Sequence, residues 1–234
     1  MAYILLNLLV LLFPLVLSFD RKVAFYKSWP AVFPSLLVIL ILFGSWDVWK
    51  TSIGVWSFSV QYAGAWRFLG LPAGEWLFFI CVPYSCIFIL ACVRAYIKEH
   101  ELPIPLWLWY VLAEAIILAG LLLMHKTYTG IVFLSVGAAI LAVRILSPNN
   151  FRSSNFWIAL AITYVPFLIA NGILTGLPIV LYDNSRNLNI RVGPIPIEDF
   201  FFSLSMLLLS FALYDFFGRK QEKHSLHKRA TALE

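Results

Sequence analysis

The chain has 234 residues, of which 62% are hydrophobic and only 12% are charged, and its formal net charge is +5. Soluble domains carry about 25% charged residues, so this composition excludes an ordinary soluble protein and indicates a membrane protein. The basic residues are spread over loops and the C-terminal tail without a nucleic-acid-binding module, so nucleic acid is not an expected partner.

Apolar runs long enough to cross a bilayer follow one another along almost the whole chain. A spanning helix needs about 20 apolar residues, and unbroken runs indicate helices rather than the alternating strands of a barrel. We therefore predict an all-α fold, a polytopic membrane helix bundle. Its seven transmembrane helices are expected at residues 4–19, 31–46, 75–93, 105–124, 128–146, 156–174 and 199–217.

Lysine and arginine are divided unevenly between the two sides of these spans. Of the 17 in the chain, only five lie on the side that holds Lys50, Arg67, Lys126, Arg186 and Arg191. Cytoplasmic loops are enriched in Lys and Arg, so we expect a multi-pass protein of the cell membrane with its N-terminus outside and its C-terminus in the cytoplasm. Residues 219–234 are then a basic cytoplasmic tail.

An internal repeat appears when the chain is displaced by 124 positions. The aligned pairs include Asp47 with Asn171, Thr51 with Thr175, Arg67 with Arg191, Pro72 with Pro196, Glu75 with Asp199, and Phe78 with Phe202. Equivalent spans are four apart, so both halves enter the membrane in the same direction. We expect a parallel 3+1+3 repeat, with three-helix repeats at 1–100 and 127–218 and a connector helix within 101–126.

Each half places an acid at the start of a membrane span, three residues after a proline. Glu75 follows Pro72 in one half, and Asp199 follows Pro196 in the other. A carboxylic acid kept neutral by apolar surroundings can donate a proton, and nearby aromatic faces attract cations. This combination suits carbocation chemistry on an alkene, in one cleft between the two halves.

Simpler interpretations of the same residues remain open at this stage. Arg67 with Glu75, and Arg191 with Asp199, can form structural ion pairs at the headgroup level, and the aromatic residues can form an interfacial belt. Glu114 lies in the middle of the connector span. A hydrogen bond to a neighbouring helix is its favoured interpretation over a catalytic role.

Four longer stretches resemble a known enzyme family. The sequences NGILTGLPIVLY at 171–182 and IRVGPIPIEDFFFSL at 190–204 are similar to integral-membrane lycopene cyclases of the heterodimeric or fused two-part type. WDVWKTSIGVWSF at 46–58 and GLPAGEWLFF at 70–79 resemble the other part of such enzymes. The resemblance covers nearly the whole chain and implies a single-chain fusion of both parts.

The resemblance implies a lycopene β-cyclase of carotenoid biosynthesis. In such an enzyme a general acid protonates the terminal double bond of an acyclic ψ end, the ring closes, and a base removes a proton to leave a β-ionone ring. The expected partners are lycopene and other acyclic-end carotenoids, the lipid bilayer and other carotenoid enzymes. The reaction is redox-neutral, so no cofactor is expected, and the cysteines and histidines show no spacing typical of a metal site.

The resemblance and the repeat together give the candidate site residues. The family signature has two adjacent acids after a proline, but Gly74 replaces the first acid in the first half, so the catalytic candidates are Glu198, Asp199 and Glu75. We expect the second half to supply the proton. The candidate substrate-binding residues are Asp47, Asn171, Thr175, Tyr182, Arg67, Arg191, Phe78 and Phe202.

Two other functions fit part of the pattern. A cyclase of another terpenoid is the nearest enzyme alternative. A small transporter built from parallel 3+1+3 repeats would share the topology. Its proline-kinked helices should recur in both halves, but Pro14, Pro34 and Pro83 have no proline partner at the displacement of 124.

Overall fold

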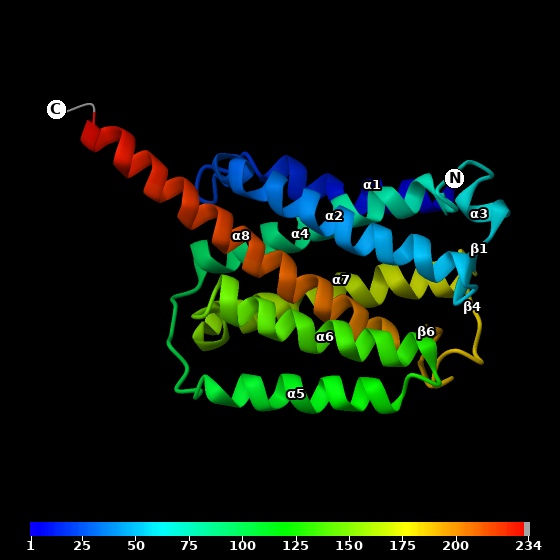
Figure 1. Ribbon diagram of the computed structural model, residues 1–234. Coiled ribbons are helices and arrows are strands. Elements are labelled where there is room, and N and C mark those ends of the chain that lie inside the picture. Colours follow the sequence, from blue (N-terminus) through cyan, green and yellow to red (C-terminus); the bar gives the residue numbers. More distant parts are fainter. Residues whose placement is uncertain (232–234) are drawn as a thin grey trace.

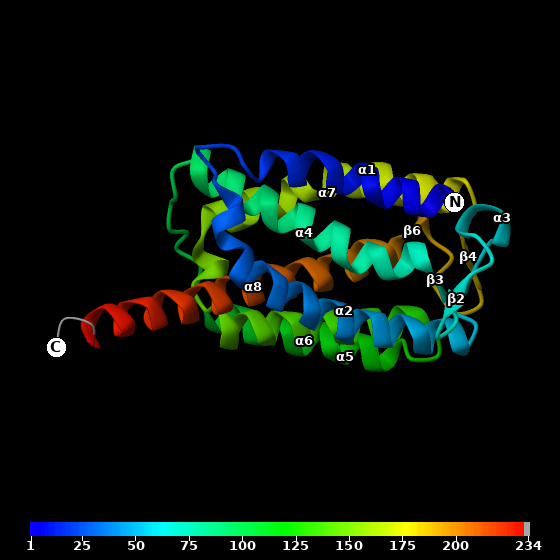
Figure 2. The same cartoon turned by 90° about the horizontal axis from the view of Figure 1, so that it is seen from above.

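The structure, a computed structural model, describes residues 1–231 as a bundle of long helices that run side by side (Figures 1 and 2). The N-terminus lies at one end of the bundle, and the last helix extends beyond the other end (Figure 1). The long helices are α1 (Ala2–Leu17), α2 (Trp29–Ser52), α4 (Ala73–Tyr96), α5 (Trp107–Leu122), α6 (Thr127–Leu146), α7 (Ser154–Gly176) and α8 (Ile197–Thr231).

Within residues 1–231, five segments are long and apolar enough to cross a membrane. They are Phe25–Ser52, Ala73–Tyr96, Thr127–Leu146, Ser154–Gly176 and Ile197–Glu222. Helices α1 and α5 are apolar but have only 16 residues each. At 1.5 Å per residue they span about 24 Å, less than the roughly 30 Å of the hydrocarbon core. The mostly helical class is confirmed, and the long apolar helices indicate a membrane protein, while two of the seven predicted spans are shorter than a full crossing.

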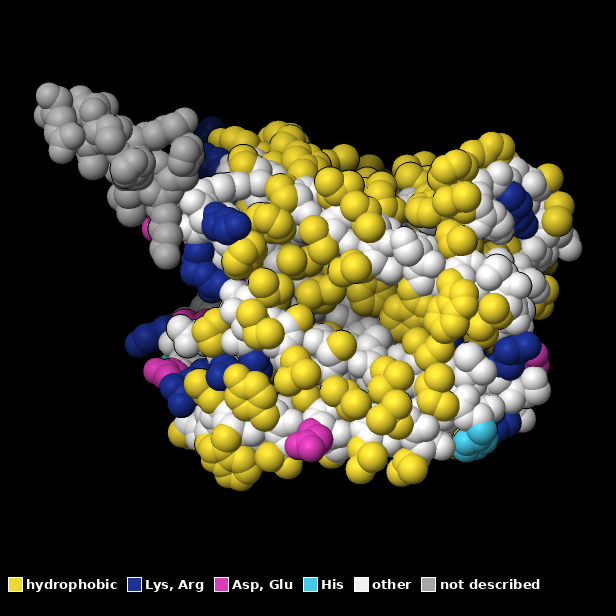
Figure 3. All heavy atoms as spheres, viewed as in Figure 1, with side chains coloured by type: hydrophobic (Ala, Val, Ile, Leu, Met, Phe, Trp, Pro, Cys, Tyr) yellow, Lys and Arg dark blue, Asp and Glu magenta, His cyan; other side chains and the backbone are white. Residues whose placement is uncertain are grey.

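The outer surface agrees with a lipid environment. Hydrophobic side chains cover most of the face shown in Figure 3, and the Lys and Arg side chains gather toward its two ends. Several helices continue past the apolar runs that predicted them. Helix α2, for example, includes the buried residues Asp47 and Lys50, which a count of apolar residues leaves outside the span. Helix α8 continues past the predicted span into the basic tail and ends at Thr231.

Short strands, which the prediction of an all-helical chain did not include, form at the end of the bundle near the N-terminus (Figure 1). Strand β1 (Trp56–Phe58) pairs antiparallel with β4 (Val180–Tyr182), and the short helix α3 (Val60–Ala63) follows β1. Strands β2 (Arg67–Phe68) and β3 (Leu71–Pro72) form a hairpin directly before α4, and β5 (Arg191–Val192) and β6 (Ile195–Pro196) form one directly before α8. The 3₁₀ helices Phe25–Ser28 and Asn150–Arg152 precede α2 and α7.

Glycine makes both hairpins possible. The β2–β3 turn passes through Leu69 and Gly70 with φ of 51° and 84°, as a type I′ turn requires, and Gly193 has φ of 60° in the β5–β6 turn. Each hairpin places a proline immediately before a helix, where its missing N–H costs no hydrogen bond. The acids Glu75 and Asp199 therefore enter the first turn of α4 and of α8 at equivalent places.

Helices α4 and α8 form the inner part of the bundle. Helix α4 packs against α1, α2 and α7, while α8 packs against α2, α4 and α6. Buried aromatic and aliphatic residues join these helices, among them Ile87, Phe156 and Phe211. Helix α5 lies at the edge of the bundle and packs against α6 (Figure 1).

The contact between α5 and α6 depends on glycine. A Cβ on Gly120 would lie 2.8 Å from the carbonyl oxygen of Gly130 and 3.0 Å from the backbone nitrogen of Leu134. Backbone atoms cannot rotate away, so we expect Gly120→Ala to lower the stability by about 1–3 kcal/mol and the melting temperature by roughly 2–12 °C.

Gly218→Ala is the matched control for this substitution, because a Cβ there would meet none of the described atoms within 4 Å. Both variants can be compared by thermal melting of the detergent-solubilised protein. Equal melting temperatures would show that α5 does not depend on this close approach.

Candidate active site

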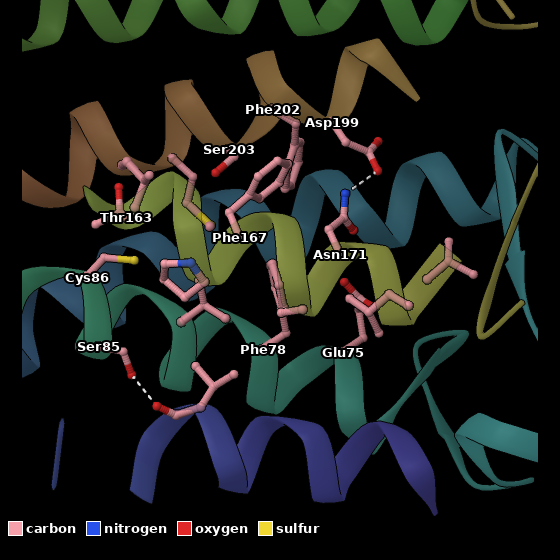
Figure 4. Close-up of a pocket in the computed structure, with 18 of the residues that line it drawn as sticks. Glu75, Phe78, Ser85, Cys86, Thr163, Phe167, Asn171, Asp199, Phe202 and Ser203 are labelled. Carbon is pink, nitrogen blue, oxygen red and sulfur yellow. Dashed lines mark hydrogen bonds between the residues drawn. The ribbon is translucent and has the colours of Figure 1, made fainter. Parts of the chain in front are cut away.

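A cavity of about 350 Å³ lies among α1, α2, α4, α7 and α8. Most of its wall is apolar and includes Pro14, Val82, Pro166 and Met206. Three acids, Asp47, Glu75 and Asp199, line the part of the cavity near the first turns of α4 and α8. Figure 4 shows Glu75, Asn171 and Asp199 close to one another there. Phe78, Phe167 and Phe202 follow along the cavity (Figure 4).

Glu75 is held by helix α1 and faces Asp47 of α2. The Tyr3 hydroxyl donates a 2.7 Å hydrogen bond to Glu75 Oε2, and the Asn7 side chain donates to the carbonyl of Gly74. The carboxyl groups of Asp47 and Glu75 are both buried and line the same cavity. Neither group has a cation partner among the described ion pairs, and two ionised carboxyl groups buried beside one cavity repel each other, so the pair favours keeping one proton. Gly74 lets Tyr3 approach, because a Cβ there would lie 2.5 Å from the tyrosine ring.

Asp199 accepts three hydrogen bonds from three different elements. The Tyr128 hydroxyl of α6 donates to Oδ1 at 2.6 Å, and the Tyr182 hydroxyl of β4 donates to Oδ2 at 2.8 Å. The Asn171 amide of α7 donates to Oδ2 at 2.8 Å (Figure 4). Burial, followed by the nearby Asp199 carboxylate, raises the pKa of Tyr182 well above its usual value, so this phenol stays protonated.

Glu198 is fully buried but does not line the cavity. Neighbouring residues on a helix point about 100° apart, and here Glu198 turns toward α6. Its Oε1 accepts hydrogen bonds from the Thr129 hydroxyl at 2.6 Å and from the backbone N–H of Leu188 at 2.8 Å. These contacts tie the start of α8 to α6 and to the preceding loop. Of the two adjacent acids, Asp199 is the one that reaches the cavity.

The other candidate residues divide into two groups. Asp47, Asn171, Tyr182, Phe78 and Phe202 line the cavity, whereas Thr175, Arg67 and Arg191 are absent from its described wall. The hydroxyl of Thr175 donates to the backbone carbonyl of Asn171 and so supports that residue from behind.

The two arginines bind backbone rather than the acids. Arg67 donates to the carbonyls of Gly64 and Phe58, and Arg191 donates to the carbonyl of Pro194. The ion pairs with Glu75 and Asp199 that the sequence left open are absent from the described residues, whose ion pairs include Arg94–Asp215, Arg152–Glu101 and Arg186–Asp183. The arginines therefore stabilise the hairpins that position the acids.

Tyr3 and Tyr128 are site residues that the sequence did not single out. Each belongs to the first helix of its half and donates a hydrogen bond to the acid of that half. A displacement of 124 aligns Tyr3 with Thr127, one position before Tyr128, so a comparison without gaps misses the pair. Glu114, in contrast, is exposed on α5 and is absent from the cavity wall, so it takes no part in this constellation.

Comparison with known families identifies the chain. The sequence model of the family described as lycopene cyclase matches residues 1–93 and 125–217, two ranges displaced by 124 positions. Comparisons with curated proteins and with solved structures give no match. The matched ranges make up most of the chain and include every acid of the cavity. The chain therefore belongs to the lycopene cyclase family.

Proposed function

We propose that the protein is a lycopene β-cyclase, which closes the acyclic ψ ends of lycopene to β-ionone rings and so forms γ-carotene and β-carotene. The observation that carries this proposal is the group of three buried carboxyls, Asp47, Glu75 and Asp199, at one part of an apolar cavity. An apolar wall suits a hydrocarbon substrate, and the carboxyls are the groups that can give and take protons there.

The reaction needs an acid, a base and protection of a cation. A proton adds to the terminal double bond, the next double bond attacks the cation to close the six-membered ring, and a second proton leaves. One proton enters and one leaves, so the balance requires no hydride carrier. The faces of Phe78 and Phe202 line the cavity and can stabilise the positive charge by about 0.5–2 kcal/mol each when water is excluded.

The size of the cavity indicates that one end of the substrate reacts at a time. Its volume of about 350 Å³ is near the lower limit for ligand cavities, which suits an end group and the adjoining polyene rather than the whole carotenoid. The rest of the carotenoid would extend along α1, α4 and α7, past Pro14 and Pro166, into the lipid. The second end must then enter after the first has left.

Sequential entry has a measurable consequence. We expect γ-carotene, with one ring, to appear first and β-carotene to follow after a lag when lycopene is supplied in liposomes or detergent. The pigments can be quantified over time by chromatography. Formation of β-carotene at its full rate from the start, without γ-carotene, would show that both ends react within one binding event.

We further propose that the chain is a parallel 3+1+3 repeat, with three-helix repeats at 1–100 and 127–218 and a connector helix within 101–126. Several structural elements correspond at the same displacement of 124 positions and support this proposal. Strand β1 corresponds to β4, hairpin β2–β3 to hairpin β5–β6, and the start of α4 to the start of α8. In the β1–β4 pair, Ser57 lies opposite Leu181, its own repeat partner, as two halves related by an approximate twofold axis require.

The orientation of the chain in the membrane is part of the same proposal. The excess of Lys and Arg places the C-terminus and residues 219–234 in the cytoplasm and the N-terminus outside. The acid-bearing end of the cavity, beside the N-terminus and the hairpins, then lies toward the outer face. Other carotenoid enzymes remain proposed partners.

Expression in cells that accumulate lycopene tests the proposed reaction. We expect pigments with β rings to appear at the expense of lycopene, and none to appear with a Glu75→Gln, Asp199→Asn double variant. Unchanged lycopene in cells that contain the folded protein would contradict the proposal and would favour a cyclase of another terpenoid or a transporter. A pigment with ε rings would correct the ring type alone.

The tyrosines offer a finer test of the site. Hydrogen bonds to charged groups contribute about 1.5–3 kcal/mol, so we expect Tyr3→Phe and Tyr128→Phe each to slow cyclisation by about tenfold to a hundredfold. Tyr164→Phe is the matched control, because its hydroxyl donates to the carbonyl of Phe200 and does not line the cavity. Initial rates normalised to the amount of folded protein decide the matter, and equal losses in all three variants would argue against a specific role.

A further inference from the structure

The two halves present different partners to their acids. Positions 47 and 171 correspond at the displacement of 124, yet one is aspartate and the other is asparagine. In the first half, the carboxyl groups of Asp47 and Glu75 are both buried and line the same cavity. In the second half, the Asn171 amide donates a hydrogen bond to Asp199 at 2.8 Å. The first half therefore holds two facing carboxyls, and the second holds one carboxyl beside an amide.

This difference sets the charge that each side carries. Two ionised carboxyl groups buried beside one cavity would repel each other, so the Asp47–Glu75 pair retains a proton, and Asp47 Oδ2 has no hydrogen-bond partner in the described part of the chain. Asp199 accepts from two phenols and one amide, and such donors stabilise the ionised form of a carboxyl group. One side thus has a proton to give, and the other has a charge able to accept one.

We propose that the Asp47–Glu75 pair donates the proton that starts cyclisation and that Asp199 removes the proton that ends it, an assignment that rests on the proposed cyclisation of lycopene. It reverses the expectation from the sequence that the second half supplies the proton. The proton of Glu75 forms a C–H bond with the electron pair of the terminal double bond. The next double bond closes the ring, and the electron pair of a ring C–H bond forms the new double bond as that proton passes to Asp199.

Tyr182 connects the two sides for the next turnover. Its hydroxyl donates to Asp199, and it lines the same cavity as Glu75 and Asp47. A phenol that accepts a proton from Asp199 while it releases its own toward the pair restores both sides. The enzyme then returns to its starting state without a net proton from solvent, although exchange with solvent can occur between turnovers.

Deuterated water separates the donor from the acceptor. In a variant that lacks the acceptor, protonation still occurs, and the cation reverts by losing either hydrogen of the carbon that received the deuteron. Each loss of the original hydrogen leaves the deuterium in lycopene. Lycopene recovered from such a variant should contain deuterium. In a variant that lacks the donor, no cation forms, so recovered lycopene should be unlabelled. We therefore expect label in lycopene recovered from Asp199→Asn and none in lycopene from Glu75→Gln, with cyclised product reduced at least about a hundredfold in both.

Two isosteric exchanges test the assignment while leaving Glu75 and Asp199 in place. Asp47→Asn places an amide beside the carboxyl group of the first half, as in the second half, so we expect unlabelled lycopene and at least tenfold less product. Asn171→Asp gives the second half the side chains of the first, so we expect labelled lycopene and at least tenfold less product. These exchanges decide the matter if a variant of Glu75 or Asp199 does not fold.

The outcomes distinguish the assignment from the proposed reaction. If the wild-type protein leaves lycopene uncyclised, the proposed reaction itself fails. If the wild type cyclises lycopene, label in lycopene from Glu75→Gln or Asp47→Asn overturns the assignment of the donor. Unlabelled lycopene from both Asp199→Asn and Asn171→Asp overturns the assignment of the acceptor.

Discussion

Replacing Asp199 with asparagine should reduce the conversion of lycopene at least about a hundredfold, whereas Glu198→Gln should stay within about tenfold of the wild type. The reason is geometric. Asp199 lines the cavity and accepts three hydrogen bonds, while Glu198 turns to Thr129 and the backbone of Leu188 outside the cavity. Glutamine keeps an oxygen for both of the hydrogen bonds that Glu198 accepts, so the start of α8 should remain in place.

The two variants are controls for each other, since both replace a buried carboxyl by an amide in the same turn of one helix. Initial rates of lycopene loss, normalised to the folded fraction from size-exclusion chromatography, give the comparison. A hundredfold loss in Glu198→Gln with little loss in Asp199→Asn would reverse the roles of the two acids and would require α8 to be rotated from the position described.

The sequence could predict the helices because their signal is local. Long apolar runs specify spans whatever surrounds them, and the predicted start at residue 199 is within two residues of the observed start of α8 at Ile197. The same signal underestimates helix length where polar residues are buried inside the bundle. Helix α2 continues to Ser52 through Asp47 and Lys50, which face other helices rather than lipid. That burial depends on tertiary contacts that hydropathy does not contain.

The strand pairs illustrate a second limit. Strands β1 and β4 are 124 residues apart and only three residues long, which is too short for a periodic sequence pattern to predict them. They form because the two loops at the end of the bundle lie side by side and their backbone groups need partners. The β2–β3 and β5–β6 hairpins, in contrast, carry a local signal in Gly70 and Gly193 that the search for apolar spans did not use.

The candidate site was predictable where the two halves correspond position by position. Asp47, Glu75, Asn171 and Asp199 align without a gap, and all four line the cavity. The pattern does not give side-chain direction, which explains why Thr175 and the arginines were grouped with residues that reach the cavity.

The site also contains the donors Tyr3 and Tyr128, whose positions differ by one residue from the repeat. Each tyrosine is the second residue of its helix, because α1 begins at Ala2 and α6 begins at Thr127, so the two helix starts are offset from the repeat by the same one residue.

A chain cut in two should lose all cyclase activity in either fragment and regain it on co-expression. Each fragment would hold only part of the site, because the cavity takes Tyr3, Asp47 and Glu75 from one half and Asn171 and Asp199 from the other. The proposed donor pair, Asp47 and Glu75, would then be separated from the proposed acceptor, Asp199. Reassociation is expected because α2 packs against α8 and α4 packs against α7, across the boundary between the halves.

The position of the cut follows from the segment between α4 and α5. Leu102 donates its N–H to the carbonyl of Arg152, and Glu99 accepts hydrogen bonds from the hydroxyls of Ser153 and Ser154. A cut after Ile104 leaves these groups on the first fragment, where they can still dock on the start of α7. We expect co-expressed fragments 1–104 and 105–234 to restore at least about a tenth of the activity. Cyclisation of lycopene by fragment 105–234 alone would show that the second half holds a complete site and that the first half only supports it.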